Sequence, residues 1–252
     1  IMLSILLLVF FNVNSVHAAM GSMPKDILVS GGVAIPSYTT AVHTNPAGIA
    51  TQSDLHLSLQ AGAEDLNDIP LYRGQLGYGN RIFGLAVGLE QADSGHTNQQ
   101  TAFYGLGVSL PLGLTLGVSG QSPVDGGESD YNAGMFLEPT QQVRLAFSAQ
   151  SLKNGADVYG LGLGLELSQG VVILVDGAFD PHFKENVLKP GLVLSNRFAG
   201  MSFSYGLDSS LLFSDGFTAG IFMKPGLRSN LEFYYNQGAG FHKGYLALTL
   251  GI

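Results

Sequence analysis

Ten charged or hydrogen-bonding side chains lie in stretches of sequence that are otherwise apolar. They are His56, Gln60, Arg73, Gln75, Arg144, Gln150, Glu166, Asp176, Glu232 and Asn236. Such groups could form hydrogen bonds and ion pairs that hold buried segments together, or they could line a polar path for small solutes. Both roles require an interior into which the side chains point, because an unpaired charge is costly in apolar surroundings.

Catalytic and metal chemistry receive little support from the other polar residues. Three histidines, His96, His182 and His242, fall in polar stretches where they could approach one another, but no nucleophile motif accompanies them. No cluster of residues has the spacing of a zinc site. We therefore expect neither an enzyme, nor a cofactor, nor a bound metal ion.

The composition argues against an ordinary soluble domain and against a nucleic-acid-binding protein. Of the 252 residues, 46% are hydrophobic and only 12% are charged, whereas a soluble domain carries about 25% charged residues. The net charge is -8, and without a basic stripe nucleic acid is not an expected partner. After residue 18 no apolar run approaches the roughly 20 residues of a spanning helix. A closed barrel is the other structure that satisfies every backbone amide in lipid.

From residue 54 to residue 252, apolar side chains recur at every second position, which places them on one face of successive strands. The clearest rows begin at Leu55, Phe83, Tyr104, Leu112, Val143, Tyr159, Met201, Phe217 and Leu246. Less regular strands fill 71–78, 130–137, 171–179, 187–195 and 228–236. The opposite face carries mostly glycine, serine and alanine, instead of the lysine and glutamate that a soluble β-sandwich would expose.

Turn signals divide this region into hairpins. Short turns are predicted at Gly79-Asn80, Pro111, Glu138-Pro139, Gln169-Gly170, Asn196-Arg197 and Pro225-Gly226. Longer polar loops are predicted near 62–70, 92–99, 121–130, 151–157, 180–187, 208–215 and 237–243. Six turns and seven loops join 14 strands, an even number with short periplasmic turns and longer outer loops. The predicted fold class is an all-β, antiparallel, up-and-down transmembrane β-barrel.

One predicted outer loop has an apolar tip, formed by Leu211, Leu212 and Phe213. An exposed apolar tip could contact lipid, a ligand or another subunit, and it could equally pack over the mouth of the barrel.

Two segments precede the strands. Residues 1–18 have an apolar core followed by Val16-His17-Ala18, which predicts a signal peptide, although the segment could be retained. Residues 19–53 lack alternation and contain Asn45-Pro46-Ala47-Gly48, residues that favour a turn. The turn could simply precede the first strand, but a plug folded inside the barrel is the favoured interpretation.

The Asn45-Pro46-Ala47-Gly48 turn ahead of a 14-strand pattern resembles the FadL-like outer-membrane transport family, of which this chain would be a short-loop member. The resemblance implies that the turn belongs to a hatch inside the barrel and that a hydrophobic compound is carried across the outer membrane. The loops here hold about seven to ten residues, too few for the apolar capture groove of that family. The resemblance therefore supports the fold and the plug more than it supports fatty-acid uptake.

Glycine rows at 105–107 and 160–164 remove bulk from the inner wall and permit close packing against a plug. Two functions remain open at this point. One is a channel or transporter for small or hydrophobic molecules, and the other is a homo-oligomeric, porin-like structural protein that organises or encloses lipid. We expect it in the bacterial outer membrane, with outer-membrane lipids, lipopolysaccharide and further copies of the chain as partners.

Overall fold

The computed structural model describes residues 32–37, 39–64, 69–80, 82–93, 98–153, 155–182, 186–207, 216–226, 229–238 and 241–252. The predicted signal peptide, the first part of the predicted plug and the apolar tip at Leu211, Leu212 and Phe213 lie outside the described residues.

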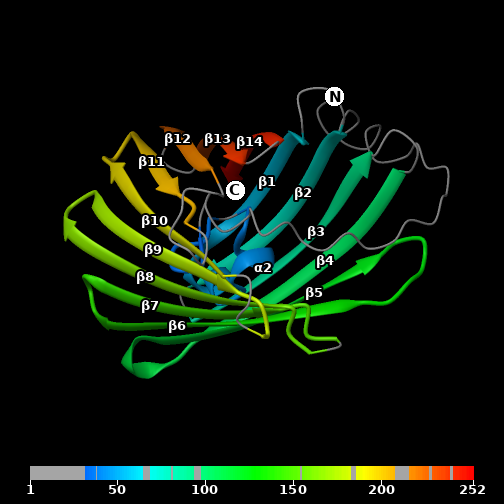
Figure 1. Ribbon diagram of the computed structural model, residues 1–252, viewed down its shortest axis with the longest axis horizontal. Helices are drawn as coiled ribbons and strands as arrows, with labels where there is room; N and C mark the ends of the chain where they lie inside the picture. Colours follow the sequence, from blue (N-terminus) through cyan, green and yellow to red (C-terminus); the bar gives the residue numbers. More distant parts are fainter. Residues whose placement is uncertain are drawn as a thin grey trace.

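The described strands close into one antiparallel barrel (Figure 1). They are β1 (Ser53–Glu64), β2 (Ile69–Asn80), β3 (Phe83–Asp93), β4 (Asn98–Ser109), β5 (Leu114–Pro123), β6 (Asp130–Thr140), β7 (Val143–Gln150), β8 (Val158–Ser168), β9 (Val171–Phe179), β10 (Asn186–Ser195), β11 (Ala199–Tyr205), β12 (Phe217–Gly226), β13 (Ser229–Gly238) and β14 (Phe241–Gly251). Each strand pairs with its neighbours in the sequence, and β1 pairs with β14 to complete the ring. The predicted 14-strand, up-and-down barrel is confirmed.

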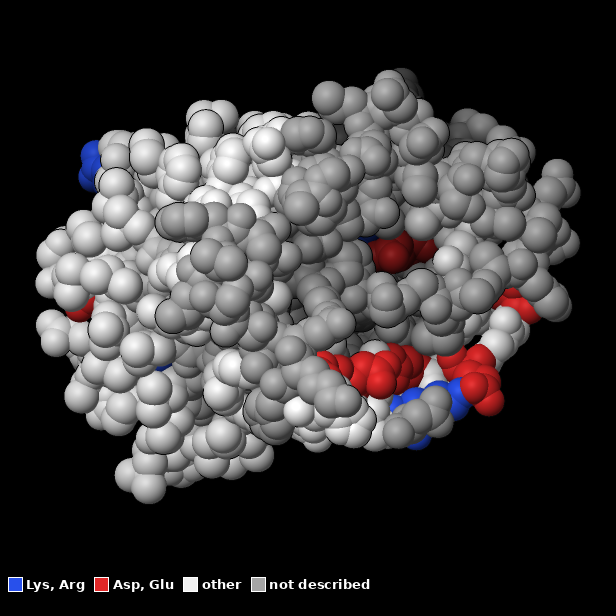
Figure 2. Space-filling model, in the orientation of Figure 1, with Lys and Arg blue, Asp and Glu red and all other residues white. Residues whose placement is uncertain are grey.

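Side chains alternate between the two surfaces of the wall. In β6, Asn132, Gly134 and Phe136 are buried, whereas Tyr131, which precedes them, and Met135, which lies between the last two, are exposed. Exposed apolar side chains of this kind occur around the barrel. Among the described residues in Figure 2, acidic side chains lie in a hollow near the centre, and acidic and basic side chains gather near the lower right edge. The ring leaves no strand edge unpaired, so an apolar outer surface and satisfied amides suit a lipid environment.

Three predicted boundaries are wrong. The turn predicted at Pro225-Gly226 falls inside β12, which continues to Gly226 with a register shift after Met223. The row beginning at Leu112 starts too early, because Leu112 lies in the short helix η2 (Pro111–Gly113) with φ 66° and is 93% exposed. Pro111 fixes φ and Gly113, at φ 74°, admits the left-handed conformation, so β5 begins only after this tight turn. The turn predicted at Glu138-Pro139 instead falls inside β6, which continues to Thr140 with a register shift after Leu137.

Described residues before β1 lie inside the ring, where Figure 1 shows α2 (Ala41–Thr44). A second short helix, α3 (Gly48–Thr51), follows the turn at residues 45–47. Neither helix could persist alone at four residues, and their burial against the wall is what orders them. No helix in the described ranges is long and apolar enough to cross a membrane.

Candidate functional site

Five inward-facing glycines receive the N-terminal segment, which we define as residues 32–37 and 39–52. This glycine belt consists of Gly84, Gly107, Gly117, Gly134 and Gly162, on β3, β4, β5, β6 and β8. A Cβ atom on Gly117 would overlap the backbone of Pro46 and Ala47, and one on Gly107 would meet Ala50. The segment and the wall therefore approach more closely than any side chain at these positions would permit.

The Asn45 side chain fixes the turn of the N-terminal segment to the wall. Its Nδ2 donates to the carbonyl oxygens of Val33, at 3.0 Å, and Met135, at 3.4 Å, while its Oδ1 accepts from the Ala47 amide at 3.2 Å. Asn45 is fully buried, so this is a docking element and not an ordinary exposed turn before a strand.

An ion pair and an aromatic ring hold the segment near α2. The guanidinium of Arg73 on β2 donates to the carboxylate of Glu90 on β3 and, at 3.4 Å, to the Thr39 carbonyl. His43 packs edge-on against Phe103, with ring centroids 4.9 Å apart. Burial, reinforced by the Arg73 charge and opposed by that of Glu90, lowers the pKa of His43 to about 3. The imidazole is therefore neutral at physiological pH, as its apolar surroundings require.

The other end of the segment is held at Ala34. The Ala34 amide donates to Asp176 Oδ1 at 3.2 Å, and its carbonyl oxygen accepts from Arg144 at 3.4 Å. Arg144 also donates to Glu138 and lies over the Phe136 ring.

Three further inward-facing side chains bond the middle of the segment or one another. Gln150 donates to the Thr44 carbonyl at 3.3 Å, and Ser119 donates to the Val42 carbonyl at 2.5 Å. Asn132 in turn donates to Ser119 Oγ. The hydrogen bonds to the N-terminal segment come from strands β2 to β9, and the glycine belt lies on strands β3 to β8. Because most of these contacts fall on β2–β8, we call these strands the packed half of the barrel.

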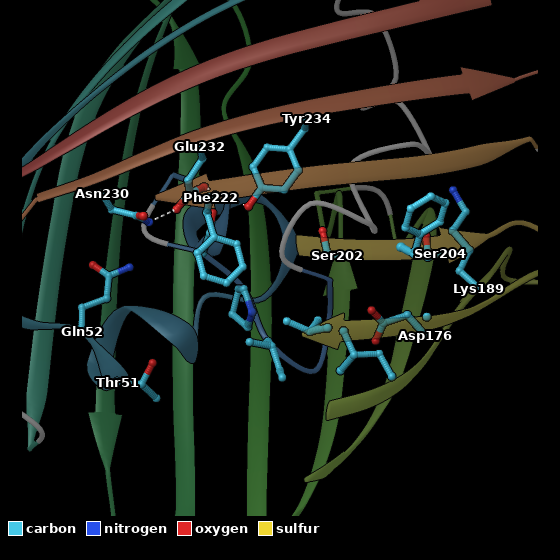
Figure 3. A pocket seen from close by; sticks show the side chains of 17 residues that line it. Thr51, Gln52, Asp176, Lys189, Ser202, Ser204, Phe222, Asn230, Glu232 and Tyr234 are labelled. Atoms are coloured by element: carbon cyan, nitrogen blue, oxygen red, sulfur yellow. Dashed lines mark hydrogen bonds between the residues drawn. The ribbon is translucent and has the colours of Figure 1, made fainter. Parts of the chain in front are cut away.

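A cavity of about 310 Å³ lies between the N-terminal segment and β9–β13, which we call the cavity half. Its lining comprises Ile35, Pro36, Ser37, Thr51, Gln52, Leu174, Asp176, Lys189, Gly191, Val193, Ser202, Phe203, Ser204, Phe222, Asn230, Glu232 and Tyr234. Figure 3 shows Asn230, Glu232, Tyr234 and Phe222 on one side, Asp176, Lys189 and Ser204 on the other, and Ser202 between them.

The polar groups of the cavity half are organised along the strands. Asp176 and Lys189 are directly paired across β9 and β10. Glu232 accepts hydrogen bonds from the Asn230 amide and, at 3.0 Å, from the Tyr234 hydroxyl, both on its own strand. Apolar side chains such as Leu174, Val193 and Phe222 contribute the rest of the surface. The site can thus accept a ligand that is partly apolar and partly polar.

The ten polar residues proposed from the sequence are distributed over both halves. His56, Arg73, Gln75, Gln150, Asp176, Glu232 and Asn236 are buried on the inner surface, and Gln60 accepts a hydrogen bond from Arg73. Of these residues, Asp176 and Glu232 line the cavity, whereas Arg73, Arg144 and Gln150 bind the N-terminal segment. The structural role considered for the group is thus seen at Arg73, Arg144 and Gln150, whereas a path for solutes stays a prediction.

Glu166 was predicted to line the lumen, and this prediction is wrong. It occupies an inward-facing position of β8, as Gly160, Gly162 and Gly164 do, but it is exposed because it lies two residues from the end of the strand, beside a short turn. A side chain at an inward-facing position near the end of a strand therefore lies at the rim of the barrel and not inside it.

Several residues of the site were missed from the sequence. Glu90 occupies one of the alternate positions of β3 that face inward, opposite the outward-facing apolar row from Phe83 to Leu89. Lys189 occupies an inward-facing position of β10, a less regular strand. Assigning alternate positions along each strand to the inner face would have found both residues. No sequence signal indicates Gln52, which enters the site only through the path of the chain between α3 and β1.

Metal binding receives no support from the described residues, in which no group of three or more histidines or acids could hold an ion.

No family model and no curated protein matches the sequence. Solved structures do match. The toluene transporter TbuX of Ralstonia pickettii aligns at a TM-score of 0.63 and 10% identity, covering 84% of this chain and 93% of that one. The monoaromatic hydrocarbon channel CymD aligns at 0.59 and 9% identity, covering 87% and 93%. A FadL homologue of Pseudomonas aeruginosa aligns at 0.59 and 10% identity, covering 87% and 95%.

These similar proteins are transport barrels and not enzymes. Identities near 10% establish common architecture without establishing a common substrate. The resemblance suggested by the turn at residues 45–48 is thus confirmed for the fold, and the chain has the 14-strand architecture of the FadL-type outer-membrane barrels.

Proposed function

We propose that this protein is an outer-membrane channel that passes small hydrophobic molecules through the cavity half of its barrel. The observation that carries the proposal is the cavity between the N-terminal segment and β9–β13. At about 310 Å³ it stands at the lower end of the roughly 300–1,000 Å³ range of ligand pockets. It therefore suits a molecule of about the size of a single substituted ring.

Two further observations support the proposal. The exposed apolar rows on the outside of the wall suit insertion into the outer membrane, with its lipids and lipopolysaccharide as surroundings. The similar structures include a transporter of toluene and a channel for monoaromatic hydrocarbons. In the cavity half, Leu174 and Phe222 offer the apolar contacts that such molecules need.

Uptake by cells tests the function. A bacterial strain without its own hydrophobic-compound channels is made to express the chain, and the initial uptake of ring-labelled toluene and 4-methylphenol is measured. Lipopolysaccharide slows the passive entry of both compounds, so the expected result is a severalfold faster uptake of at least one of them. The matched control is Ser202→Phe, which fills the cavity from β11 and should return uptake to the rate of cells without the protein.

The alternative function, a structural protein that assembles with copies of itself, predicts a different pair of results. Uptake would be unchanged by expression of the chain, and planar bilayers containing it would show no steady current. Both results together would overturn the channel proposal.

A further inference from the structure

Three residues of the cavity wall carry buried polar atoms that lack a hydrogen-bond partner among the described residues. Gln52 is only 5% exposed, and neither its Nε2 nor its Oε1 has a hydrogen-bond partner among the described residues. The same holds for Ser204 Oγ and Asn230 Oδ1. All three residues line the cavity. Because buried polar groups are normally paired, their grouping indicates a ligand that supplies the missing bonds.

The remaining wall restricts the rest of that ligand to an apolar body. Ile35 and Pro36 approach from the N-terminal segment, and Leu174, Val193 and Phe222 approach from the barrel. Figure 3 shows the Phe222 ring beside the polar groups of β13. A planar ring could stack against Phe222 while a polar substituent reaches the amide groups.

The charges of the cavity argue against an organic acid. Two carboxyl side chains, Asp176 and Glu232, stand against one amine, Lys189, which is directly opposite Asp176 in the register of β9 and β10. Without an excess of positive charge, the site has little to attract a carboxylate from water, and the acids would repel it. The ligand should therefore be neutral.

We propose that the cavity binds a neutral molecule with one apolar ring and one hydroxyl group, a phenol, and that Gln52 and Asn230, which lie on the same side of the cavity in Figure 3, recognise the hydroxyl. This inference rests on the proposed channel function and names its substrate class. A hydroxyl both donates and accepts, so it can accept from the Gln52 amide while donating to Asn230 Oδ1. A pure hydrocarbon would leave both groups unpaired.

Calorimetric titration of the full chain in lipid nanodiscs, with empty nanodiscs as the blank, tests the inference. The three probes are 4-methylphenol, toluene and 4-methylbenzoate, which differ mainly in one substituent of the ring. We expect 4-methylphenol to bind about tenfold more tightly than either of the others, since each satisfied hydrogen bond in a dry site contributes on that scale.

Two variants assign the preference to named residues. Gln52→Leu and Asn230→Leu each keep the approximate shape of the side chain but remove its amide. Each should bring the affinity for 4-methylphenol to within about twofold to threefold of that for toluene, without weakening toluene binding. Gln142→Leu is the matched control, because it removes an amide from the exposed turn between β6 and β7 and should change nothing. Heat-dependent mobility on gels shows which variants have folded.

The results separate this inference from the channel function. Toluene that binds as tightly as 4-methylphenol, together with unchanged affinities in Gln52→Leu, would overturn the phenol site, and channel-dependent uptake of toluene would survive that result. Tight 4-methylphenol binding that both variants lose would uphold the site. If cells then took up neither compound faster, only the channel function would fail.

Discussion

The two halves of the barrel use small inward-facing residues in opposite ways. In the packed half, the glycine belt leaves space that the backbone of the N-terminal segment occupies. In the cavity half, the space beside the inward-facing Gly191 and Gly220 is occupied by side chains of the wall itself, including Ser204 and Ser202. The glycine content of a barrel strand therefore does not reveal whether its lumen is filled. What matters is whether a second segment reaches it.

The polar groups differ between the halves in the same way. Arg73, Arg144 and Gln150 in the packed half donate to backbone carbonyls of the N-terminal segment. In the cavity half, Gln52, Ser204 and Asn230 keep atoms without a partner among the described residues. The packed half should accordingly determine stability, and the cavity half should determine which molecules pass.

Removal of the buried cation should have the largest effect on stability. Arg73→Met leaves the partly buried Glu90 carboxylate without its ion pair, which should lower the free energy of unfolding by about 3 kcal/mol. Urea titration of the folded protein in detergent measures the loss. Arg144→Met is the comparison, because its ion pair with Glu138 is much more exposed, and it should lose about 1 kcal/mol or less. Equal losses would contradict the assigned difference between the two sites.

One methyl group added to the glycine belt should have the next largest effect. In Gly117→Ala the new Cβ would overlap the backbone of Pro46 and Ala47, so the free energy of unfolding should fall by about 2 kcal/mol. Gly164→Ala is the matched control on the same inner surface, where the nearest atom would be 3.6 Å away. The prediction fails if both substitutions prove equally harmless in the same urea titration.

Acid should weaken the packed half through His43. Its pKa in the folded state is about 3, far below the ordinary value of 6.5, because burial and Arg73 disfavour the charged form while Glu90 opposes them only in part. The unfolded chain therefore binds the proton first, and stability should fall by up to about 1 kcal/mol per pH unit as pH drops from 6.5 toward 3. Unfolding measured from pH 7 to pH 4 should show this slope, and His43→Leu should flatten it. An unchanged slope in that variant would assign the acid sensitivity to other groups.

A large addition to the cavity half should have the smallest effect on stability. Ser202→Phe adds a whole ring, but the ring enters open space, so the free energy of unfolding should change by no more than about 0.5 kcal/mol. An aromatic ring added on β11 would then lower the free energy of unfolding less than a methyl group added on β5. A loss of stability comparable to that of Gly117→Ala would remove the distinction between the halves.

The sequence predicted the barrel well because its physical basis is local. Alternation with period two fixes which side chains of β1, β3 and β4 face outward, and the breakers at 79–80, 169–170 and 196–197 fix where hairpins turn. The error at Leu112 arose where Pro111 and Gly113 form a tight turn that delays β5. The error at Glu138-Pro139 arose because this proline lies at a register shift within β6 and not at the turn that follows.

The site was predicted less completely because it depends on contacts between distant parts of the chain. The glycine rows indicated close packing, and Gly107 and Gly162 do meet the N-terminal segment. Nothing in the sequence indicates that the described residues of this segment pack mainly against β2–β8 and leave a cavity beside β9–β13. Gln52 joins the cavity only as a result of that asymmetry.

Single cysteines provide the most direct test of the asymmetry, because the natural chain contains no cysteine. Ser202→Cys places a thiol on the cavity wall, and Ser119→Cys places one on the packed wall, beneath the Val42 carbonyl. A water-soluble maleimide should label the Ser202→Cys variant and abolish channel-dependent uptake, while the folded Ser119→Cys variant stays unlabelled and active. Equal labelling of both positions, or unimpaired uptake after labelling at position 202, would contradict a passage along β9–β13.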